Sequence, residues 1–477
     1  MNIVLSEDNP RVLLIRLGSD VAQQVGFPRA IRPSFTLKYM ESLLKKADYP
    51  TKFIDGFLTP LTTPALLEST LAWNPDFVVV LGTSNEYEKL LSFSELLSLS
   101  KNITIIAVGQ DVTARPEEYI FIDSPIDIIL LGESEINLLK FLEKFKTERD
   151  LAKLKQEYAV DITSLAPAIV SDLDNLPFPS YRKIELRKYI FPYPIRLNKI
   201  LRWGHILSSR GCPYECIFCS QTIRESYGTQ IRLRSAENVV DEIEYLKLQG
   251  ANVISFDDDA FTNSRTHVFA VCEEMKRRKG KIPWLVHAKV DDLDVDLMRE
   301  MKDAGCLLLR LGIESGSERI VNILKKTDKD NWIEKSKEVI AKAKELDMAV
   351  ATLFLVGNPS ETEEEIKKTI ALAKELNPDV LQVSYFTPYP GSFAYKEFQN
   401  IIKKEDVSRL YHYREPVLNV SRVDSLKLKA LYKDFYREFL LRFSFFIEHI
   451  RRYIGFYFFN PKVLWRLLKI ISYLNKK

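Results

Sequence analysis

Three cysteines within eight positions form the strongest chemical signal in the sequence. Cys212, Cys216 and Cys219 are separated by three and by two residues. They follow an expected strand, Ile206–Ser208, and Phe218 stands beside the last of them. Three thiolates at this spacing can bind three irons of a 4Fe-4S cluster, which takes four ligands, and leave one iron open. A zinc site is the alternative, but zinc needs a fourth Cys or His ligand and none is close in sequence.

Four short motifs follow the cysteine loop, each at the end of an expected strand. The residues singled out in them are Asp258 in Phe256–Asp259, Glu314 and Ser315 in Arg310–Gly316, Gly357 in Gly357–Thr362, and Pro390 in Pro388–Ser392. A run of three aspartates by itself is more often a solvated turn. Ligands on parallel sheets bind at the carboxyl ends of strands, so the position of these motifs favours binding.

The elements that must position these motifs alternate between strand and helix. The expected strands are Ile206–Ser208, Val253–Phe256, Leu285–His287, Leu307–Gly312, Val350–Leu355 and Val380–Ser384. Six such units are fewer than the eight of a closed barrel. We therefore expect an open, partial (β/α)6 barrel over residues 196–400.

The cysteine loop and the four later motifs, in this order, resemble the radical S-adenosylmethionine (SAM) superfamily. The resemblance implies that SAM chelates the open iron of the cluster, and that one electron cleaves its sulfonium to give a 5′-deoxyadenosyl radical. It also implies a SAM-binding role for the motif residues. These residues are Asp258 near the methionine group, Glu314 and Ser315 near the ribose and carboxylate, Gly357 in the turn after the fifth strand, Pro390 near the adenine, and Phe218 beside the cofactor.

The first 150 residues predict a second parallel sheet. Continuous apolar strands are expected at Arg11–Leu17, Lys52–Asp55, Asp76–Leu81, Thr104–Val108 and Ile126–Leu131, with helices between them. Such strands are typical of a doubly wound, Rossmann-like domain that is covered by helices on both faces. The candidate ligand contacts at the strand ends are Asp55, Thr83, Ser84, Gly109, Gly132 and Glu133. Small residues at these ends let a large flat ligand approach the backbone.

A doubly wound domain ahead of such a barrel is similar to the cobalamin-binding class of radical SAM enzymes. The D-x-H-x-x-G motif of histidine-ligated cobalamin domains is absent, and residues 1–150 contain no histidine. The resemblance therefore implies cobalamin whose cobalt receives no histidine from this domain. A Rossmann-like domain that has lost its ligand is the alternative.

The favoured function is methylation of an unactivated carbon by the deoxyadenosyl radical and methylcobalamin. Ring formation or porphyrin-type oxidation is the alternative within the same class. A tRNA methylthiotransferase is disfavoured, because that family carries extra cysteines in its N-terminal domain and residues 1–150 here have none. A non-catalytic corrinoid or Fe-S protein is a further alternative. The resemblance implies an external one-electron donor of the flavodoxin or ferredoxin type and a small-molecule or lipid substrate.

Composition limits the partners. The net charge of +3 gives no case for nucleic acid. It combines −6 over residues 1–420 with +9 from there to the end. After a proline-containing linker at 151–195, residues 401–477 are expected to form a basic helical region. This region either lies on a membrane surface or caps the barrel mouth. The first ten residues lack a signal-peptide pattern, which favours a cytoplasmic location. Cys272 and Cys306 are expected in packing positions, and His287 either faces the substrate or packs.

Overall fold

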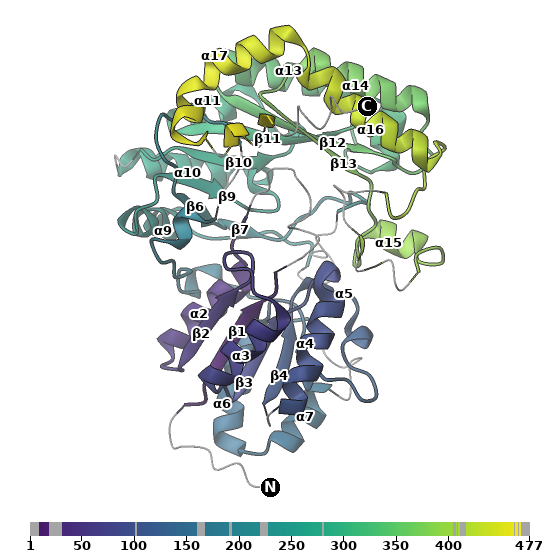
Figure 1. Ribbon diagram of the computed structural model, residues 1–477. Coiled ribbons are helices and arrows are strands. Elements are labelled where there is room, and N and C mark those ends of the chain that lie inside the picture. Colours follow the sequence, from purple (N-terminus) through teal and green to yellow (C-terminus); the bar gives the residue numbers. More distant parts are fainter. Residues whose placement is uncertain are drawn as a thin grey trace.

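The computed structural model places two parallel sheets one above the other (Figure 1). It describes residues 9–18, 31–100, 103–159, 167–189, 193–219, 228–278, 281–403, 407, 409–410, 416–461, 463–465 and 467–468. Three regions discussed above lie partly outside these ranges. They are the first ten residues, which lack a signal-peptide pattern, the expected linker at 151–195, and the end of the basic tail.

The N-terminal sheet has five strands, all parallel. They are β1 (Val12–Arg16), β2 (Thr51–Asp55), β3 (Phe77–Leu81), β4 (Thr104–Val108) and β5 (Ile128–Leu130), in the order β2-β1-β3-β4-β5. Leu13 and Ile15 pack on one helical layer, whereas Val12 and Leu14 pack on the other. The doubly wound fold is confirmed, because apolar side chains cover both faces of each strand.

Two layers of helices enclose this sheet. They are α2 (Phe35–Lys46), α3 (Thr63–Trp73), α4 (Tyr87–Ser100), α5 (Gln110–Ala114), α6 (Ser134–Glu148) and α7 (Leu151–Ala159). α2, α6 and α7 contribute to one face and α3, α4 and α5 to the other. α7 lies within the segment expected as a linker, where its Leu154 is buried against the sheet.

The second sheet has six parallel strands in an open arrangement, as expected for a partial barrel. The strands are β6 (Trp203–Ile206), β9 (Val253–Phe256), β10 (Trp284–Ala288), β11 (Cys306–Glu314), β12 (Ala349–Val356) and β13 (Val380–Tyr385), joined in sequence order. The expected strand Ile206–Ser208 was wrong in its bounds. Trp203 pairs in register with Val253, so the strand begins earlier and the cysteine loop begins sooner.

Five helices cover the outside of this sheet: α9 (Ala236–Leu248), α10 (Arg265–Arg277), α11 (Val295–Asp303), α13 (Trp332–Glu345) and α14 (Glu363–Leu376). Two short helices, α12 (Glu318–Ile323) and α15 (Phe393–Phe398), pack against the cysteine loop. A two-stranded ribbon of β7 (Ser209–Arg210) and β8 (Arg232–Leu233) leads out of the barrel. Cys272 and Cys306 are fully buried in the barrel core, in the packing positions expected for them.

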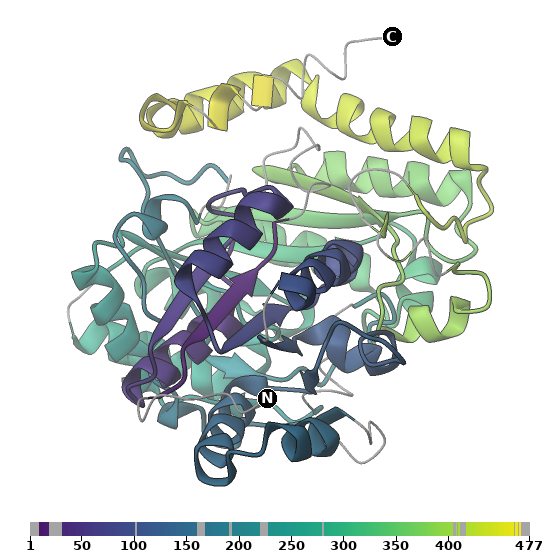
Figure 2. The same cartoon turned by 60° about the horizontal axis from the view of Figure 1, so that its bottom comes forward.

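Two C-terminal helices, α16 (Ser425–Leu440) and α17 (Phe443–Phe459), form an outer layer on the side of the barrel away from the N-terminal sheet (Figures 1 and 2). Tyr453, Phe456 and Tyr457 of α17 pack on residues at the amino ends of the barrel strands. A cap is therefore present, but at the closed end of the barrel and not at its mouth. Within the described residues, no helix has both the length and the apolar content needed to cross a bilayer.

Candidate active site

The cysteine loop is anchored by backbone contacts and by one buried side chain. The Ile217 N–H donates to the Leu324 carbonyl at 3.1 Å, and the Ile217 carbonyl accepts from the Ala394 N–H at 3.0 Å. Ile217 is buried among residues of α12 and α15, and Phe218 packs against the same cluster. Gly211 opens the loop with φ +96°, and a Cβ there would lie 2.5 Å from the Gln230 carbonyl oxygen. These contacts fix the shape of the loop.

The three thiols of this loop fit an iron–sulfur cluster. Cys212, Cys216 and Cys219 are each partly exposed, and among the described residues the cysteines form no disulfide. Burial raises the pKa of Cys212 to about 11 and also raises the pKa of Cys216, so metal binding must displace their protons. In the described part of the chain, no three His, Cys, Asp or Glu side chains converge on one ion position. Thiolates are the usual ligands of iron–sulfur clusters, and three of them leave one iron of a 4Fe-4S cluster open.

A buried ion pair lies beside the thiols. Lys326 Nζ is 2.7 Å from Glu314 Oε1 at the end of β11. Burial opposes the charge of Lys326, but Glu314 and then the Cys216 thiol raise its pKa above the usual value. Glu314 adopts φ +69°, and a Cβ on Gly312 would meet both partners. Lys326 was missed by the sequence reasoning. The only available signal was a pair of lysines after α12.

The three aspartates after β9 have different surroundings. Asp258 Oδ1 accepts hydrogen bonds from the Ser208 N–H, the Ser208 hydroxyl and the Ser209 hydroxyl at 2.6–2.9 Å. Its Oδ2 is buried without a hydrogen-bond partner in the described structure, and burial raises the pKa of Asp258 to about 6. Asp258 thus fixes the start of the cysteine loop and has one oxygen left for a ligand. Asp257 and Asp259 line the cavity described below.

Ser315 and Gly357 lie in packed surroundings. The Ser315 hydroxyl is 3.2 Å from the Thr369 hydroxyl of α14 and is fully buried. Gly357 has φ +77°, and a Cβ there would lie 2.9 Å from Leu428 of α16. The carboxylate of Glu361 accepts from the N–H groups of Gly357 and Asn358 at 2.8 and 3.0 Å. The motif that begins at Gly357 therefore forms the tight turn before α14.

A cavity of about 500 Å³ lies between the carboxyl ends of the two sheets. Its lining comes from both halves of the chain and from the connecting turns: Arg32, Pro33, Ser34, Phe35, Thr36, Leu81, Gly82, Thr83, Ser84, Asn85, Gly109, Gln110, Asp111, Glu133, Glu135, Leu207, Ser209, Arg210, Gly211, Asp257, Asp259, Tyr389 and Pro390. These described lining residues include no histidine. The candidates Thr83, Ser84, Gly109, Glu133 and Pro390 thus meet at one cavity.

The cavity provides a surface that fits a large flat ligand such as a corrin ring. At Gly109, φ is +116°, and a Cβ would lie 2.9 Å from Leu81 Cδ1 and 3.0 Å from the Gly82 carbonyl oxygen. This strand end is therefore restricted to glycine and presents its backbone to the cavity. The Ser84 hydroxyl donates to Asp111 Oδ1 at 2.6 Å, which holds the next turn in place.

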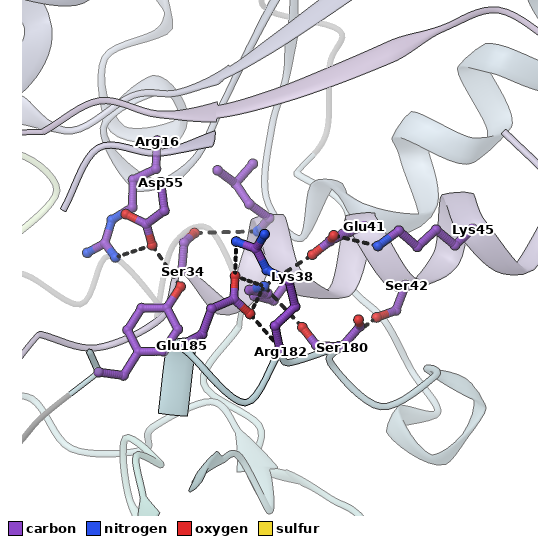
Figure 3. Close-up of polar contacts among 12 residues, drawn as sticks. Arg16, Ser34, Lys38, Glu41, Ser42, Lys45, Asp55, Ser180, Arg182 and Glu185 are labelled. Atoms are coloured by element: carbon purple, nitrogen blue, oxygen red, sulfur yellow. Dashed lines mark hydrogen bonds and ion pairs between the residues drawn. The ribbon is translucent and has the colours of Figure 1, made fainter. Parts of the chain in front are cut away.

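Two further candidates lie outside the cavity lining. Gly132 has φ +72°, and a Cβ there would lie 2.5 Å from the backbone of Ala168. This glycine therefore allows the backbone at Ala168 to pair with the end of β5. Asp55 accepts from the Tyr189 hydroxyl at 2.8 Å and lies 3.5 Å from Arg16. Figure 3 shows Asp55 and Arg16 near the buried ion pair of Lys38 with Glu185, which ties α2 to the segment that leads into the barrel.

An ion-pair network joins the N-terminal sheet to the cysteine loop. Glu133 Oε2 accepts from Arg232 Nη1 at 2.8 Å and lies 3.2 Å from Arg210 Nη1, while Arg210 Nη2 donates to Glu135 Oε1 at 3.0 Å. Burial alone would raise the pKa of Glu133, but Arg232, Arg210 and the Val170 N–H together lower it below the usual value. Arg210 is two residues before Cys212, so this network links the strand ends of the N-terminal sheet to the start of the cysteine loop.

Comparisons with known proteins agree with this geometry. Residues 206–373 match the Radical SAM superfamily. An uncharacterized methyltransferase of Pyrococcus horikoshii is 27% identical, covering 89% of this chain and 91% of that protein. The anaerobic magnesium-protoporphyrin IX monomethyl ester cyclase of Cereibacter sphaeroides is also 27% identical, over 87% of this chain and 68% of its own. A provisionally named methylthiotransferase of Methanocaldococcus jannaschii is 30% identical, and the match covers 66% of this chain and 67% of that protein.

The fold has a close counterpart among solved structures. The radical SAM methyltransferase TsrM from Kitasatospora setae, solved with cobalamin and a [4Fe-4S] cluster bound, superposes with a TM-score of 0.64. The match covers 83% of this chain and 78% of TsrM, at 16% sequence identity. The arrangement of a doubly wound sheet followed by a partial barrel is therefore a known one.

Proposed function

The chain belongs to the radical SAM superfamily, and from this premise we propose that it is a cobalamin-dependent enzyme that methylates an unactivated carbon. The observation that carries this proposal is the cavity shared by the two sheets, with the cysteine loop beginning at its wall in Gly211. When bound, the cluster supplies one electron to cleave SAM, and the corrinoid supplies a methyl group. Both groups must be close to one substrate, and a shared cavity meets that requirement.

The residues of the chain have separate tasks in this proposal. Cys212, Cys216 and Cys219 bind the cluster. Lys326 and Glu314 present a compensated ion pair beside it, and the free oxygen of Asp258 is directed to SAM. The remaining residues proposed from the motifs have two tasks. Phe218 and Pro390 contact SAM, whereas Ser315 and Gly357 shape turns of its site, since both are packed against other elements.

The corrinoid is proposed to lie against the ends of β3 and β4, where Thr83, Ser84 and Gly109 line the cavity. Glu133 fixes the position of this edge through Arg210 and Arg232. Asp55 and Gly132 are proposed to support these strand ends from positions outside the lining of the cavity. An external flavodoxin- or ferredoxin-type protein is proposed as the electron donor, with a small molecule as substrate.

A cyclase or oxidase is the second candidate, because the similarity to the magnesium-protoporphyrin cyclase covers 87% of this chain. The two functions need the same cofactors and differ in the product. A methylthiotransferase is disfavoured, since residues 1–150 contain no cysteine to bind another cluster.

The test is to reconstitute the full chain anaerobically with iron, sulfide and hydroxocobalamin, and to supply a low-potential reductant together with SAM carrying a deuterated methyl group. Extract from a strain that lacks the protein serves as the substrate source. Methylation predicts 5′-deoxyadenosine and a product heavier by one deuterated methyl group. A ring-closed or oxidised product without the label would favour the second candidate, and the absence of corrinoid binding would overturn both.

We also propose that α17 touches a membrane surface. Its outward side carries Phe443, Ile454 and Phe458, which are 78%, 64% and 79% exposed, with exposed Ile447 on the same side. Exposed Arg451 flanks this stripe, and residues 421–477 carry 13 Lys and Arg against 4 Asp and Glu. A helix that is apolar outward and flanked by cations fits an anionic lipid surface.

A further inference from the structure

One carboxylate of the shared cavity has an oxygen without a partner. Glu135, the second residue of α6, lines the cavity and is only 3% exposed. Its Oε1 accepts a hydrogen bond from Arg210 Nη2 at 3.0 Å. Its Oε2 is buried and has no hydrogen-bond partner among the described residues. Because burying a carboxylate oxygen without a hydrogen bond is costly, this atom indicates a ligand that donates a hydrogen bond to it.

Glu133, two residues earlier in the same lining, has no such free oxygen. Its Oε1 accepts a hydrogen bond from Arg232 Nη2. Its Oε2 accepts from Arg232 Nη1 at 2.8 Å and from the Val170 N–H at 2.7 Å. The protein itself therefore satisfies both oxygens of Glu133, whereas Glu135 has one oxygen left for a ligand.

Two hydroxyls of the lining also accept but cannot donate. The Ser84 hydroxyl donates to Asp111 Oδ1 at 2.6 Å, and the Thr83 hydroxyl donates to Glu86 Oε2 at 3.0 Å. A hydroxyl has only one hydrogen, so each of these two side chains can only accept a hydrogen bond from a ligand. Thr83, Ser84 and Glu135 all line the cavity, and we call them the acceptor wall.

The acceptor wall suits one form of corrin ring better than another. The ring of cobalamin carries carboxamide side chains around its periphery, and each primary carboxamide supplies N–H donors. A corrin with free carboxylic acids at those positions presents ionised oxygens, which can only accept. Opposite the acceptor wall such oxygens would find no donor, and opposite Glu135 they would also meet a like charge. The wall therefore distinguishes the two forms.

We propose that Glu135 Oε2 accepts a hydrogen bond from a carboxamide of the corrin ring, and that the acceptor wall thereby selects amidated corrinoids over corrinoids with free carboxylic acids. This inference rests on the proposed function, because it concerns the corrinoid of that site. It gives Glu135 a task that differs from the task of Glu133, which joins the N-terminal sheet to the cysteine loop.

The test compares two corrinoids that both lack the nucleotide. Cobinamide carries carboxamides at the positions where cobyrinic acid carries carboxylates. Their dissociation constants for the full chain are measured by equilibrium dialysis at constant ionic strength and about pH 8, where Glu86 is ionised because burial raises its pKa only to about 7. The wild type is expected to bind cobinamide at least roughly 10-fold more tightly than cobyrinic acid.

Glu135→Gln keeps the size of the side chain and removes its charge. The Gln amide can donate to a carboxylate, so cobyrinic acid should bind more tightly and cobinamide more weakly. The preference for cobinamide is expected to fall at least roughly fivefold. Glu143→Gln is the matched control, because Glu143 is an exposed residue of the same helix outside the cavity lining, and this variant should keep the wild-type preference.

Three results would overturn the proposal. The first is a wild type that binds cobinamide and cobyrinic acid equally, a measurement that does not depend on the folding of any variant. The second is a wild type that binds hydroxocobalamin but not cobinamide, since recognition would then lie in the nucleotide. The third is a preference in Glu135→Gln equal to that of the wild type.

Two further measurements separate this inference from its alternatives. SAM affinity of the reconstituted chain should differ by less than roughly threefold between the wild type and Glu135→Gln. A loss of SAM affinity with unchanged cobinamide binding would assign the free oxygen to SAM and overturn the proposal. A preference that depends on Glu135 while no methyl transfer is found would contradict the proposed methylation and leave this inference supported.

Discussion

The two sheets of this protein are both parallel and both covered by helices, yet they present different surfaces to the cavity between them. The N-terminal sheet is apolar on both faces and offers only its edge, where Thr83, Ser84 and Gly109 meet the cavity. The barrel is apolar on its outer face and has a polar layer inside, which includes His205 and Arg310. A flat sheet enclosed by two helical layers can bind a ligand only beyond its strand ends, whereas an open barrel can also bind one inside.

Because the two sheets present different surfaces, substitutions in each are expected to impair different properties. Changes at the N-terminal edge should affect the corrinoid and leave the cluster intact. Changes in the cysteine loop should do the reverse. The Glu133 network joins both, and α17 should affect neither.

The largest effect is expected at the cysteine loop. Cys216→Ala removes one of the three thiolates, so bound iron should fall to background and SAM cleavage should fall at least roughly 100-fold. Iron content, sulfide content and 5′-deoxyadenosine formation are the measurements. Cys272→Ala is the control, because this buried cysteine only packs, and it should keep its cluster. Full SAM cleavage in Cys216→Ala would refute the assignment of the site.

On the other side of the cavity, Thr83→Trp should fill the space next to the end of β3. Corrinoid affinity, measured by absorbance after gel filtration, is expected to fall at least roughly 10-fold because a bulky ring takes up the binding volume. Iron content should remain that of the wild type. Ser92→Trp places the same ring on an exposed position of α4 and should bind corrinoid normally. Equal corrinoid binding by both variants would contradict the placement.

The link between the sheets is tested by Glu133→Gln. Loss of charge at this buried carboxylate should lower the free energy of unfolding by about 2 kcal/mol at pH 7, read from the urea midpoint. The same change at exposed Glu157, which pairs with Lys144, should cost less than about 0.5 kcal/mol. A midpoint for Glu133→Gln equal to that of the wild type would show that the network does not stabilise the fold.

The same variant has a distinct pH dependence. Since the folded pKa of Glu133 is lowered, its contribution to stability is present above the unfolded pKa of about 4.3 and is lost as the pH falls through the lower folded pKa. The difference between wild type and Glu133→Gln should therefore be constant from pH 7 to 5 and shrink below about pH 4. A difference that grows on acidification would contradict the depressed pKa.

The smallest effect on catalysis is expected at α17. Ile447→Glu combined with Phe458→Glu should leave SAM cleavage unchanged, because the outward side of α17 is remote from the cavity. Co-sedimentation with vesicles that contain phosphatidylglycerol should fall at least roughly threefold. Vesicles of phosphatidylcholine alone serve as the comparison. A wild type that does not sediment with either vesicle would refute the membrane contact.

Much of the fold could be predicted from the sequence, because long apolar strands such as Asp76–Leu81 and Thr104–Val108 have only one stable environment. Strand bounds were less certain where apolar and polar residues mix. The first barrel strand was placed at Ile206–Ser208, but Trp203–Ile206 pairs with β9. α4 was expected only as one of the helices between the strands and was given no bounds, because a short 3-10 turn after β3 blurs its beginning.

The candidate site was predicted only in part. The cysteines and the turn residues Gly109 and Pro390 could be found from local spacing. Lys326 and Arg32 could not, because a lysine or arginine in a sequence is usually a surface residue. Their role depends on which carboxylates lie nearby, and those come from distant strands.

The sequence by itself determined the alternation of strands and helices, the three-thiol loop and the order of the motifs, since these depend on local spacing and side-chain chemistry. Only the tertiary structure decided that Gly132 and Asp55 lie outside the cavity lining, that Ser315 and Gly357 are packed against α14 and α16, and that the cap closes the amino end of the barrel. It also brought Arg32, Asp257 and Arg310 together from three separate segments. The physical reason is that burial and pairing of charge depend on strand order and register, which local sequence patterns do not specify.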